Sequence, residues 1–149
     1  DRTAKNLRSQ WRVPSSCAVI TLNKNHGIAS LVNAGMPSSF YFNAAAKKIS
    51  QVDGINKTHP IGELNSNELV VDYTIPMNKG DILASFSDGF LEFFKRVVDT
   101  SIGDYLSAIA KSLRGDAEGI GSKLLKELAL NENKISASYD LSFVVVGKN

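Results

Sequence analysis

Cysteine and histidine are scarce in this sequence, which holds one cysteine and two histidines among 149 residues. A single cysteine cannot form an intramolecular disulfide, and disulfide-free chains of this kind are usual in the reducing cytosol. We therefore expect a cytoplasmic protein. Cys17 lies in an apolar run, so we expect its thiol to be buried and unreactive rather than a nucleophile.

Long apolar runs and a strong net charge are also missing. No run approaches the roughly 20 apolar residues that a membrane-spanning helix needs, and no signal peptide is visible. The net charge of +2 is too small to indicate nucleic-acid binding. The sequence thus predicts no membrane segment and no nucleic-acid partner. The basic residues near the start are interpreted as a solvated helix face, and they are Arg2, Lys5, Arg8 and Arg12.

Several catalytic patterns are absent as well. The sequence contains no Gly-x-Ser-x-Gly elbow, which removes support for a serine hydrolase. It also contains no Gly-rich phosphate loop. His26 and His59 have no metal-ligand partner at a useful spacing. A haloacid-dehalogenase-type nucleophile needs a second Asp two positions before Asp88, and Phe86 stands there instead.

The overall composition is that of an ordinary globular domain. Hydrophobic residues make up 43% of the chain and charged residues 21%, and 149 residues suffice for one domain with its own core. We therefore predict a single domain over residues 1–149, with residues 1–13 as a lead-in segment. Because the chain begins with Asp1 rather than Met, we expect it to be part of something longer, or to lack an earlier part.

The first two thirds of the chain predict strands joined by tight turns. Short apolar or alternating runs are bounded by Asn, Gly, Pro and Asp, which favour turns. His26 falls in such a turn, so we expect it to be exposed. Turns are predicted at residues 23–27, 33–37, 53–54 and 78–81. Strands are predicted at residues 16–22, 28–33, 38–42, 46–52, 69–75 and 82–87, and a final strand at 141–146.

The last third predicts two helices before that final strand. Asp104 is expected to cap the first helix, which stops near Gly115, and Asp116 to cap the second. Apolar residues at helical spacing are expected to be buried against one sheet, and they include Leu106, Ile109, Leu113, Leu124, Leu125 and Leu128. This order of elements predicts an α+β fold in which helices pack outside antiparallel sheets.

Two carboxylates are the main candidates for chemistry. Asp88 follows the predicted strand 82–87, and Gly89 is interpreted as letting the backbone turn directly after it. Asp140 precedes the final strand. We predict that strands 82–87 and 141–146 lie in one sheet, with both carboxylates near the same edge. Such oxygen ligands suit Mg²⁺ or Mn²⁺. The alternatives are a structural turn at Asp88 and a strand-entry role for Asp140.

Four motifs occur in a specific order. They are Asn33-Ala34-Gly35-Met36-Pro37, His59-Pro60-Ile61-Gly62, the segment from Lys79 to Glu92, and Tyr139-Asp140-Leu141-Ser142. In order and approximate spacing they resemble motifs of the bacterial SpoIIE-like phosphatases, a branch of the metal-dependent protein phosphatase superfamily (PPM, type 2C-like). The resemblance covers the chain from about Val13 onward.

The resemblance implies a sandwich of two antiparallel β-sheets flanked by helices. It also implies a site with two metal ions, Mn²⁺ or Mg²⁺, held by Asp side chains, whose bridging water attacks phosphorus. The implied substrate is phosphoserine or phosphothreonine on a bacterial signalling protein, often an anti-sigma-factor antagonist. Asp88 carries over as a metal ligand, and Asp140 as a substitute ligand.

Three departures from the family pattern leave two functions open. The family's first acidic Asp-Gly motif has no counterpart, so about the first third of the family domain is expected to be absent. Met36 replaces a His, and Tyr139 stands where a metal-binding Asp is usual. The chain is thus interpreted as a metal-dependent serine/threonine phosphatase domain or as a catalytically impaired module that binds a signalling partner. For this chain alone we expect weak metal binding and little activity.

Overall fold

Pairing between antiparallel strands organises the chain into two sheets. The computed structural model describes residues 16–52, 60, 72–134 and 140–148. In these residues, one sheet has three strands in the order β1-β2-β5, namely β1 (Cys17–Asn23), β2 (Ile28–Ala34) and β5 (Asp72–Pro76). Leu31 in β2 is opposite Ile20 on one side and Tyr73 on the other, so their side chains share a face.

The second sheet has four strands in the order β4-β3-β6-β7. They are β3 (Phe40–Asn43), β4 (Lys48–Gln51), β6 (Ile82–Phe86) and β7 (Phe143–Gly147). All of the pairings are antiparallel, and β6 is buried along its whole length. Burial on both faces explains why this strand is a continuous apolar run rather than an alternating one.

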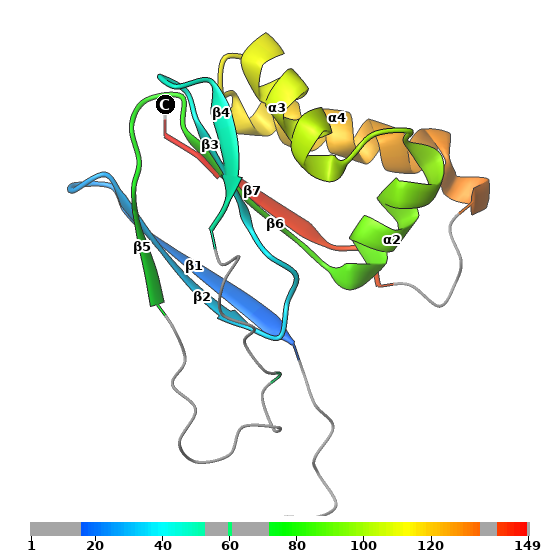
Figure 1. Cartoon of the computed structure of the whole chain (residues 1–149), viewed down its shortest axis with the longest axis horizontal. Coiled ribbons are helices and arrows are strands. Elements are labelled where there is room, and N and C mark those ends of the chain that lie inside the picture. The colour runs from blue at the N-terminus through cyan, green and yellow to red at the C-terminus, as the bar shows by residue number, and fades with distance from the viewer. Residues whose placement is uncertain (1–15, 53–59, 61–71, 135–139, 149) are drawn as a thin grey trace, which may run out of the picture.

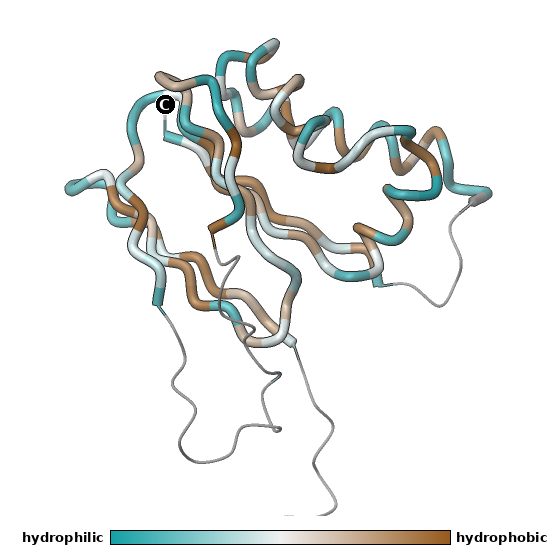
Figure 2. Tube along the Cα trace, in the orientation of Figure 1, coloured by the Kyte–Doolittle hydropathy of each residue, from teal (hydrophilic) through white to brown (hydrophobic). Residues whose placement is uncertain are grey.

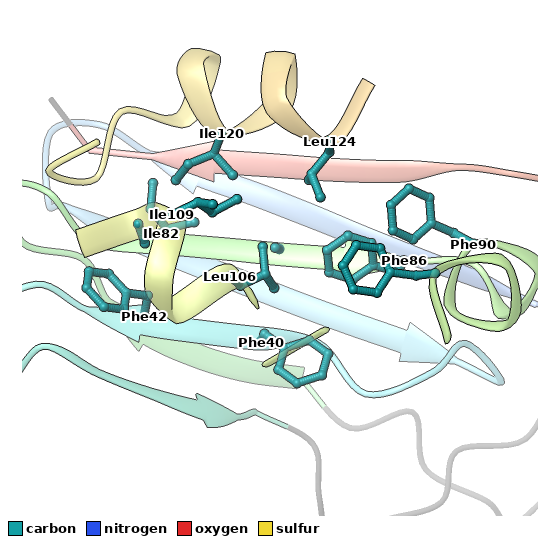
Figure 3. Close-up of a cluster of buried hydrophobic side chains, with 12 residues drawn as sticks. Phe40, Phe42, Ile82, Phe86, Phe90, Leu106, Ile109, Ile120 and Leu124 are labelled. Carbon is teal, nitrogen blue, oxygen red and sulfur yellow. The ribbon is translucent and has the colours of Figure 1, made fainter. Parts of the chain in front are cut away.

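Helices cover the outer face of the four-stranded sheet (Figure 1). In the described residues they are α2 (Asp88–Val97), α3 (Ile102–Ser112) and α4 (Ala117–Leu130), and a short 3-10 helix follows at Glu132–Lys134. Figure 3 shows side chains from the helices and the sheet meeting in one cluster, which includes Phe40, Phe42, Ile82, Phe86, Phe90, Leu106, Ile109, Ile120 and Leu124.

The other face of this sheet packs against the three-stranded sheet. Leu83 of β6 lies fully buried with Ala29 and Leu31 of β2 and Ile75 of β5. Apolar segments accordingly follow the strands of both sheets in Figure 2. The structure therefore confirms the predicted α+β fold, a sandwich of antiparallel sheets with helices outside it.

Most of the predicted strands are confirmed with small shifts in their ends, but the helices need two corrections. Helix α2 was not predicted, because Asp88-Gly89 was interpreted as a turn. Helix α3 begins earlier than expected, since Ser101 rather than Asp104 is its N-cap and accepts a hydrogen bond from the Asp104 N–H. Asp116 is the N-cap of α4 as predicted, although its side chain makes no capping hydrogen bond.

The predicted helix core is confirmed with one exception. Leu106, Ile109 and Leu124 are buried, and Leu113 and Leu128 pack half-buried against the same cluster. The prediction that Leu125 is buried is wrong, because 58% of this residue is exposed. Consecutive helical residues lie about 100° apart around the axis, so Leu124 and Leu125 cannot both face the sheet.

Some predictions fall on residues outside the described ranges. These are the basic residues Arg2, Lys5, Arg8 and Arg12 in the lead-in segment, the turn at Asp53-Gly54, His59, the first part of the strand expected at 69–75, and Tyr139.

Candidate functional site

The candidate site lies where β6 gives way to α2. Ser87 leaves the extended backbone of β6 and is the N-cap of α2, accepting a hydrogen bond from the Phe90 N–H at 3.2 Å. Phe90, Phe93 and Phe94 are buried, and this three- and four-residue spacing fixes the inner face of α2. Asp88 is therefore held in the exposed first turn, where the positive end of the helix dipole favours a carboxylate.

The hydroxyl of Ser87 also joins this turn to the segment before β7. Ser87 Oγ donates to the Asp140 carbonyl at 2.7 Å and accepts from the Ser142 N–H at 3.0 Å. The Ser87 N–H donates to the Ser142 carbonyl at 2.9 Å, which extends the β6–β7 pairing by one position. These bonds hold Asp140 beside the start of α2.

Asp88 and Asp140 line one pocket of about 680 Å³. The prediction that their strands share a sheet is confirmed, since β6 pairs with β7 and Phe86 is opposite Phe143 at the end nearest the carboxylates. Figure 1 shows β6 and β7 side by side, with α2 at this end. Both aspartates are exposed, so their oxygens are accessible to a ligand. Their role as metal ligands stays a prediction.

A loop after β2 brings Met36 to the same pocket. The buried Asn33 side chain shapes this loop, accepting from the Met36 N–H at 2.9 Å and donating to the Met36 carbonyl at 3.1 Å and the Pro37 carbonyl at 3.3 Å. Gly35 has φ +71°, and a Cβ there would lie 2.7 Å from the backbone nitrogen of Pro60. Parts of all four motifs of the resemblance are thus gathered at or beside this end of the sandwich.

Two residues of the site differ from expectation. Gly89 does not turn the chain after a strand, because it lies in the first turn of α2. Cys17 is half-buried and lines the pocket, whereas a buried thiol was expected. Ser87 was not singled out from the sequence. The sequence does contain the spacing of a capped amphipathic helix, with Ser87 as the cap and Phe90, Phe93 and Phe94 on the apolar face.

The donor chemistry of the pocket suits part of a hard-cation site. Two carboxylates supply the oxygen ligands that Mg²⁺ and Mn²⁺ prefer. In residues 16–52, 60, 72–134 and 140–148, however, no three or more His, Cys, Asp or Glu side chains form a group that could hold a metal. The described residues therefore provide a pair of candidate ligands rather than a complete set.

Asp81, in the same long motif as Asp88, lies at the opposite end of β6 and is fully buried. Its carboxylate accepts hydrogen bonds from Tyr41 Oη at 2.6 Å and from the N–H groups of Asn78 and Ala44, both at 2.8 Å. Burial of the phenol, reinforced by this carboxylate, raises the pKa of Tyr41 to about 12. The motif thus has a structural aspartate before β6 and an exposed one after it.

Comparison with protein families gives a match over nearly the whole chain. The model described as stage II sporulation protein E (SpoIIE) matches residues 1–147. The comparison with curated protein sequences gives no significant match.

Solved structures with similar folds include phosphatase domains. The Mn-presoaked phosphatase domain of the cell fate determinant SpoIIE from Bacillus subtilis superposes with a TM-score of 0.62 at 21% identity, covering 100% of this chain and 67% of that one. The RsbU and RsbW domains of a Mycobacterium tuberculosis protein give a TM-score of 0.61 at 17% identity, covering 97% and 39%. The SiaA-PP2C domain of Pseudomonas aeruginosa gives 0.58 at 12%, covering 99% and 57%.

These superpositions show a shared fold, and the chain spans about two thirds or less of each of these relatives. None of the described helices is long and apolar enough to cross a membrane.

Proposed function

Because this chain belongs to the stage II sporulation protein E (SpoIIE) family, we propose that it is part of a metal-dependent serine/threonine phosphatase. Its substrate in this proposal is a phosphorylated regulatory protein of the cytoplasm, such as an anti-sigma-factor antagonist. The observation that supports it is the convergence of Asp88 and Asp140 on one pocket at the shared end of β6 and β7.

Asp88 and Asp140 are the residues that would hold the metal. A bound Mn²⁺ or Mg²⁺ would lower the pKa of a water molecule, so that it could lose a proton at neutral pH and act as the nucleophile toward phosphorus. The chain's own contribution is positioning. The Ser87 hydroxyl keeps the Asp140 segment against the start of α2, and the Asn33 loop places Met36 in the lining of the pocket.

The second candidate is a phosphatase-like module that binds a signalling partner without turnover. The ligand set favours it, because two dications need several anionic oxygens and the described lining of the pocket contains only Asp88 and Asp140 as carboxylates. In that case the same pocket is the docking point for a partner protein.

Titration of Mn²⁺ by calorimetry separates the proposed site from adventitious binding. We expect weak binding to this chain that Asp88→Asn reduces at least tenfold, because the variant loses a charged ligand but keeps its shape. Asp99→Asn is the control, since Asp99 is an exposed carboxylate that follows α2 and does not line the pocket. Equal loss in both variants would contradict a metal role for Asp88.

Hydrolysis of a phosphoserine peptide with added Mn²⁺ then decides between the two functions. We expect little turnover by these 149 residues and chelator-sensitive turnover by a longer protein that contains them and an N-terminal acidic motif. Asp88→Ala should abolish that turnover. If the longer protein binds Mn²⁺ at Asp88 and still turns over no phosphopeptide, the partner-binding module is the correct reading.

A further inference from the structure

A second pocket, of about 660 Å³, lies at the opposite end of the four-stranded sheet from Asp88. It is formed by the turns after β3 and β5, the α3–α4 turn, and the residue after β7. Its lining includes five basic residues, Lys47, Lys79, Lys111, Arg114 and Lys148, and one acidic residue, Asp116. The charge of the lining is therefore strongly positive, although the whole chain carries only +2.

These basic residues come from separate segments of the chain and meet only in the folded structure. Within the part of the chain that the structure describes, none of them forms an ion pair, since the ion pair found there joins Arg96 and Glu92 on α2. Lys148 is the exception in direction, because its Nζ donates to the Met77 carbonyl at 3.0 Å and lies beside Gly27, outside this pocket. The charges that face the pocket are therefore those of the other four basic residues. Because like charges repel across the pocket, an anion bound there would relieve that repulsion.

The backbone around this pocket is closely fixed. Gly80 and Gly115 have φ of +82° and +76°, and a Cβ on Gly115 would lie only 2.0 Å from the Gly80 carbonyl oxygen. The Gly80 N–H donates to the Lys148 carbonyl at 2.8 Å. The turns that carry the cations are therefore held against one another.

The pocket also has an apolar floor. Ala44 is half-buried there, and Phe42 and Ala110 line the pocket with the small part of their surface, 3% and 2%, that the core cluster leaves exposed. The N-terminus of the 14-residue α4 begins directly after Asp116, and its positive dipole end adds to the field of the side chains. A ligand that satisfies both features combines anionic groups with an apolar or aromatic part.

We propose that this pocket binds a small phosphate-bearing molecule with an aromatic part, of the nucleotide class. Its volume is within the range of about 300–1,000 Å³ that small-molecule sites occupy. Phosphate oxygens would accept from Lys111 and Arg114, while the aromatic part would contact Ala44 and the exposed edges of Phe42 and Ala110. Strand β6 separates it from the carboxylate pocket by roughly 14 Å, at about 3.4 Å per residue. The proposal does not depend on phosphatase activity.

Calorimetric titration with ADP, pyrophosphate and adenosine tests the proposal. We expect ADP to bind, pyrophosphate to bind more weakly because it lacks the aromatic part, and adenosine not to bind. The double variant Lys111→Gln/Arg114→Gln should weaken ADP binding about tenfold or more, since two charge-assisted contacts are lost. Both side chains are exposed, so the variant should keep its fold, which its thermal transition checks.

Two further variants make the result specific. Lys123→Gln/Lys126→Gln removes the same charge from exposed positions of α4 that do not line the pocket, and it should leave ADP binding unchanged. Asp116→Asn removes the one opposing charge, keeps a good N-cap residue, and should tighten binding roughly threefold.

Several outcomes would overturn the proposal. Absence of ADP binding to the folded chain would do so, as would equal weakening by the two lysine-containing double variants, which would indicate a diffuse charge effect. Binding of adenosine as tight as that of ADP would show that phosphate is not recognised. Tighter binding of a phosphoserine peptide than of ADP would show that the pocket docks protein rather than a small molecule.

Discussion

At the scale of single residues, the buried aspartate before β6 shows how a charged group is retained in the interior. Asp81 is fully buried, and each of its oxygens accepts a hydrogen bond, from backbone N–H groups and from the Tyr41 hydroxyl. Hydrogen bonds to both oxygens offset much of the cost of burying a carboxylate, whereas removing one donor leaves a lone pair without water or partner. This carboxylate consequently fixes the turn between β5 and β6.

Tyr41 makes that arrangement measurable through pH. Its pKa is raised from 10.0 to about 12, chiefly by burial and then by the Asp81 carboxylate. Below pH 10 the phenol is protonated in both the folded and the unfolded chain, so its contribution to stability is complete. Between pH 10 and 12 the unfolded chain loses this proton first, so the free energy of unfolding should fall as pH rises.

The variant Tyr41→Phe tests this contribution in urea-unfolding experiments at several pH values. We expect a loss of about 1.5–3 kcal/mol near pH 8, because a hydrogen bond to a charged group is removed, and a shallower decline above pH 10. Tyr105 titrates in the same window, since burial and Glu127 raise its pKa to about 12. Tyr105→Phe is therefore the necessary comparison. An unchanged slope in both variants would contradict this assignment.

At the scale of elements, aromatic packing behind the candidate site holds α2 in place. The ring of Phe90 lies 5.0 Å from that of Phe86, 5.3 Å from that of Phe143 and 6.1 Å from that of Phe94, measured between centroids. These contacts connect α2 with both β6 and β7. The position of Asp88 thus depends on this cluster of phenylalanines, two of which, Phe86 and Phe143, also line the pocket beside it.

Replacing Phe90 by Ala should therefore cost about 3–5 kcal/mol of stability, the usual range for a large buried aromatic residue. Leu125→Ala is the matched control on α4. Because 58% of Leu125 is exposed, its replacement should change the free energy of unfolding by less than about 0.5 kcal/mol. Thermal or urea unfolding of both variants gives the comparison, and similar losses would show that α4 is rotated relative to the sheet.

The elements also show what the sequence could and could not predict. Continuous and alternating apolar runs predicted the strands, because a strand buried on both faces is apolar throughout and a strand buried on one face alternates. The same runs do not state which strands pair, so the two sheets were supplied by the family resemblance. Helix α2 was missed because Asp-Gly is typical of turns, although the Phe90, Phe93 and Phe94 spacing indicated a helix.

The candidate site, like the fold, could be predicted only in part. Asp88 and Asp140 were identified from their positions beside apolar strands, and β6–β7 pairing brings them to one pocket. The contribution of Met36 was not predictable from local pattern, since it depends on how Asn33 folds its loop against a distant part of the chain. The basic pocket could not be predicted from the sequence either, because its cations come from separate segments that meet only in the fold.

At the scale of the whole molecule, the helical layer and the sandwich are joined at the end remote from Asp88. The α3–α4 turn meets the β5–β6 turn where Gly115 lies against the carbonyl of Gly80. Each glycine has a positive φ, which side chains of other residues disfavour. This contact brings the α3–α4 turn directly against the β5–β6 turn.

Gly115→Ala should therefore destabilise the protein by at least about 2 kcal/mol, because the new Cβ combines an unfavourable backbone conformation with a clash against backbone. Gly121→Ala is the matched control in α4, where nothing lies within 4 Å of an added Cβ. That change should stabilise the helix by roughly 0.5–1 kcal/mol. Thermal unfolding measures both, and a neutral Gly115→Ala would mean that the two turns are not in contact.

The bonds made by Ser87 have a consequence for the order of folding. They join residues 53 and 55 positions apart, and the helices α2, α3 and α4 lie in the closed loop. The β1–β2 hairpin closes a far shorter loop and has a smaller entropic barrier. We therefore expect the hairpin to form early and the carboxylate pocket to be assembled last, when β7 docks beside β6. During synthesis, the three-stranded sheet can form before β7 has emerged, whereas the candidate site does not exist until it has.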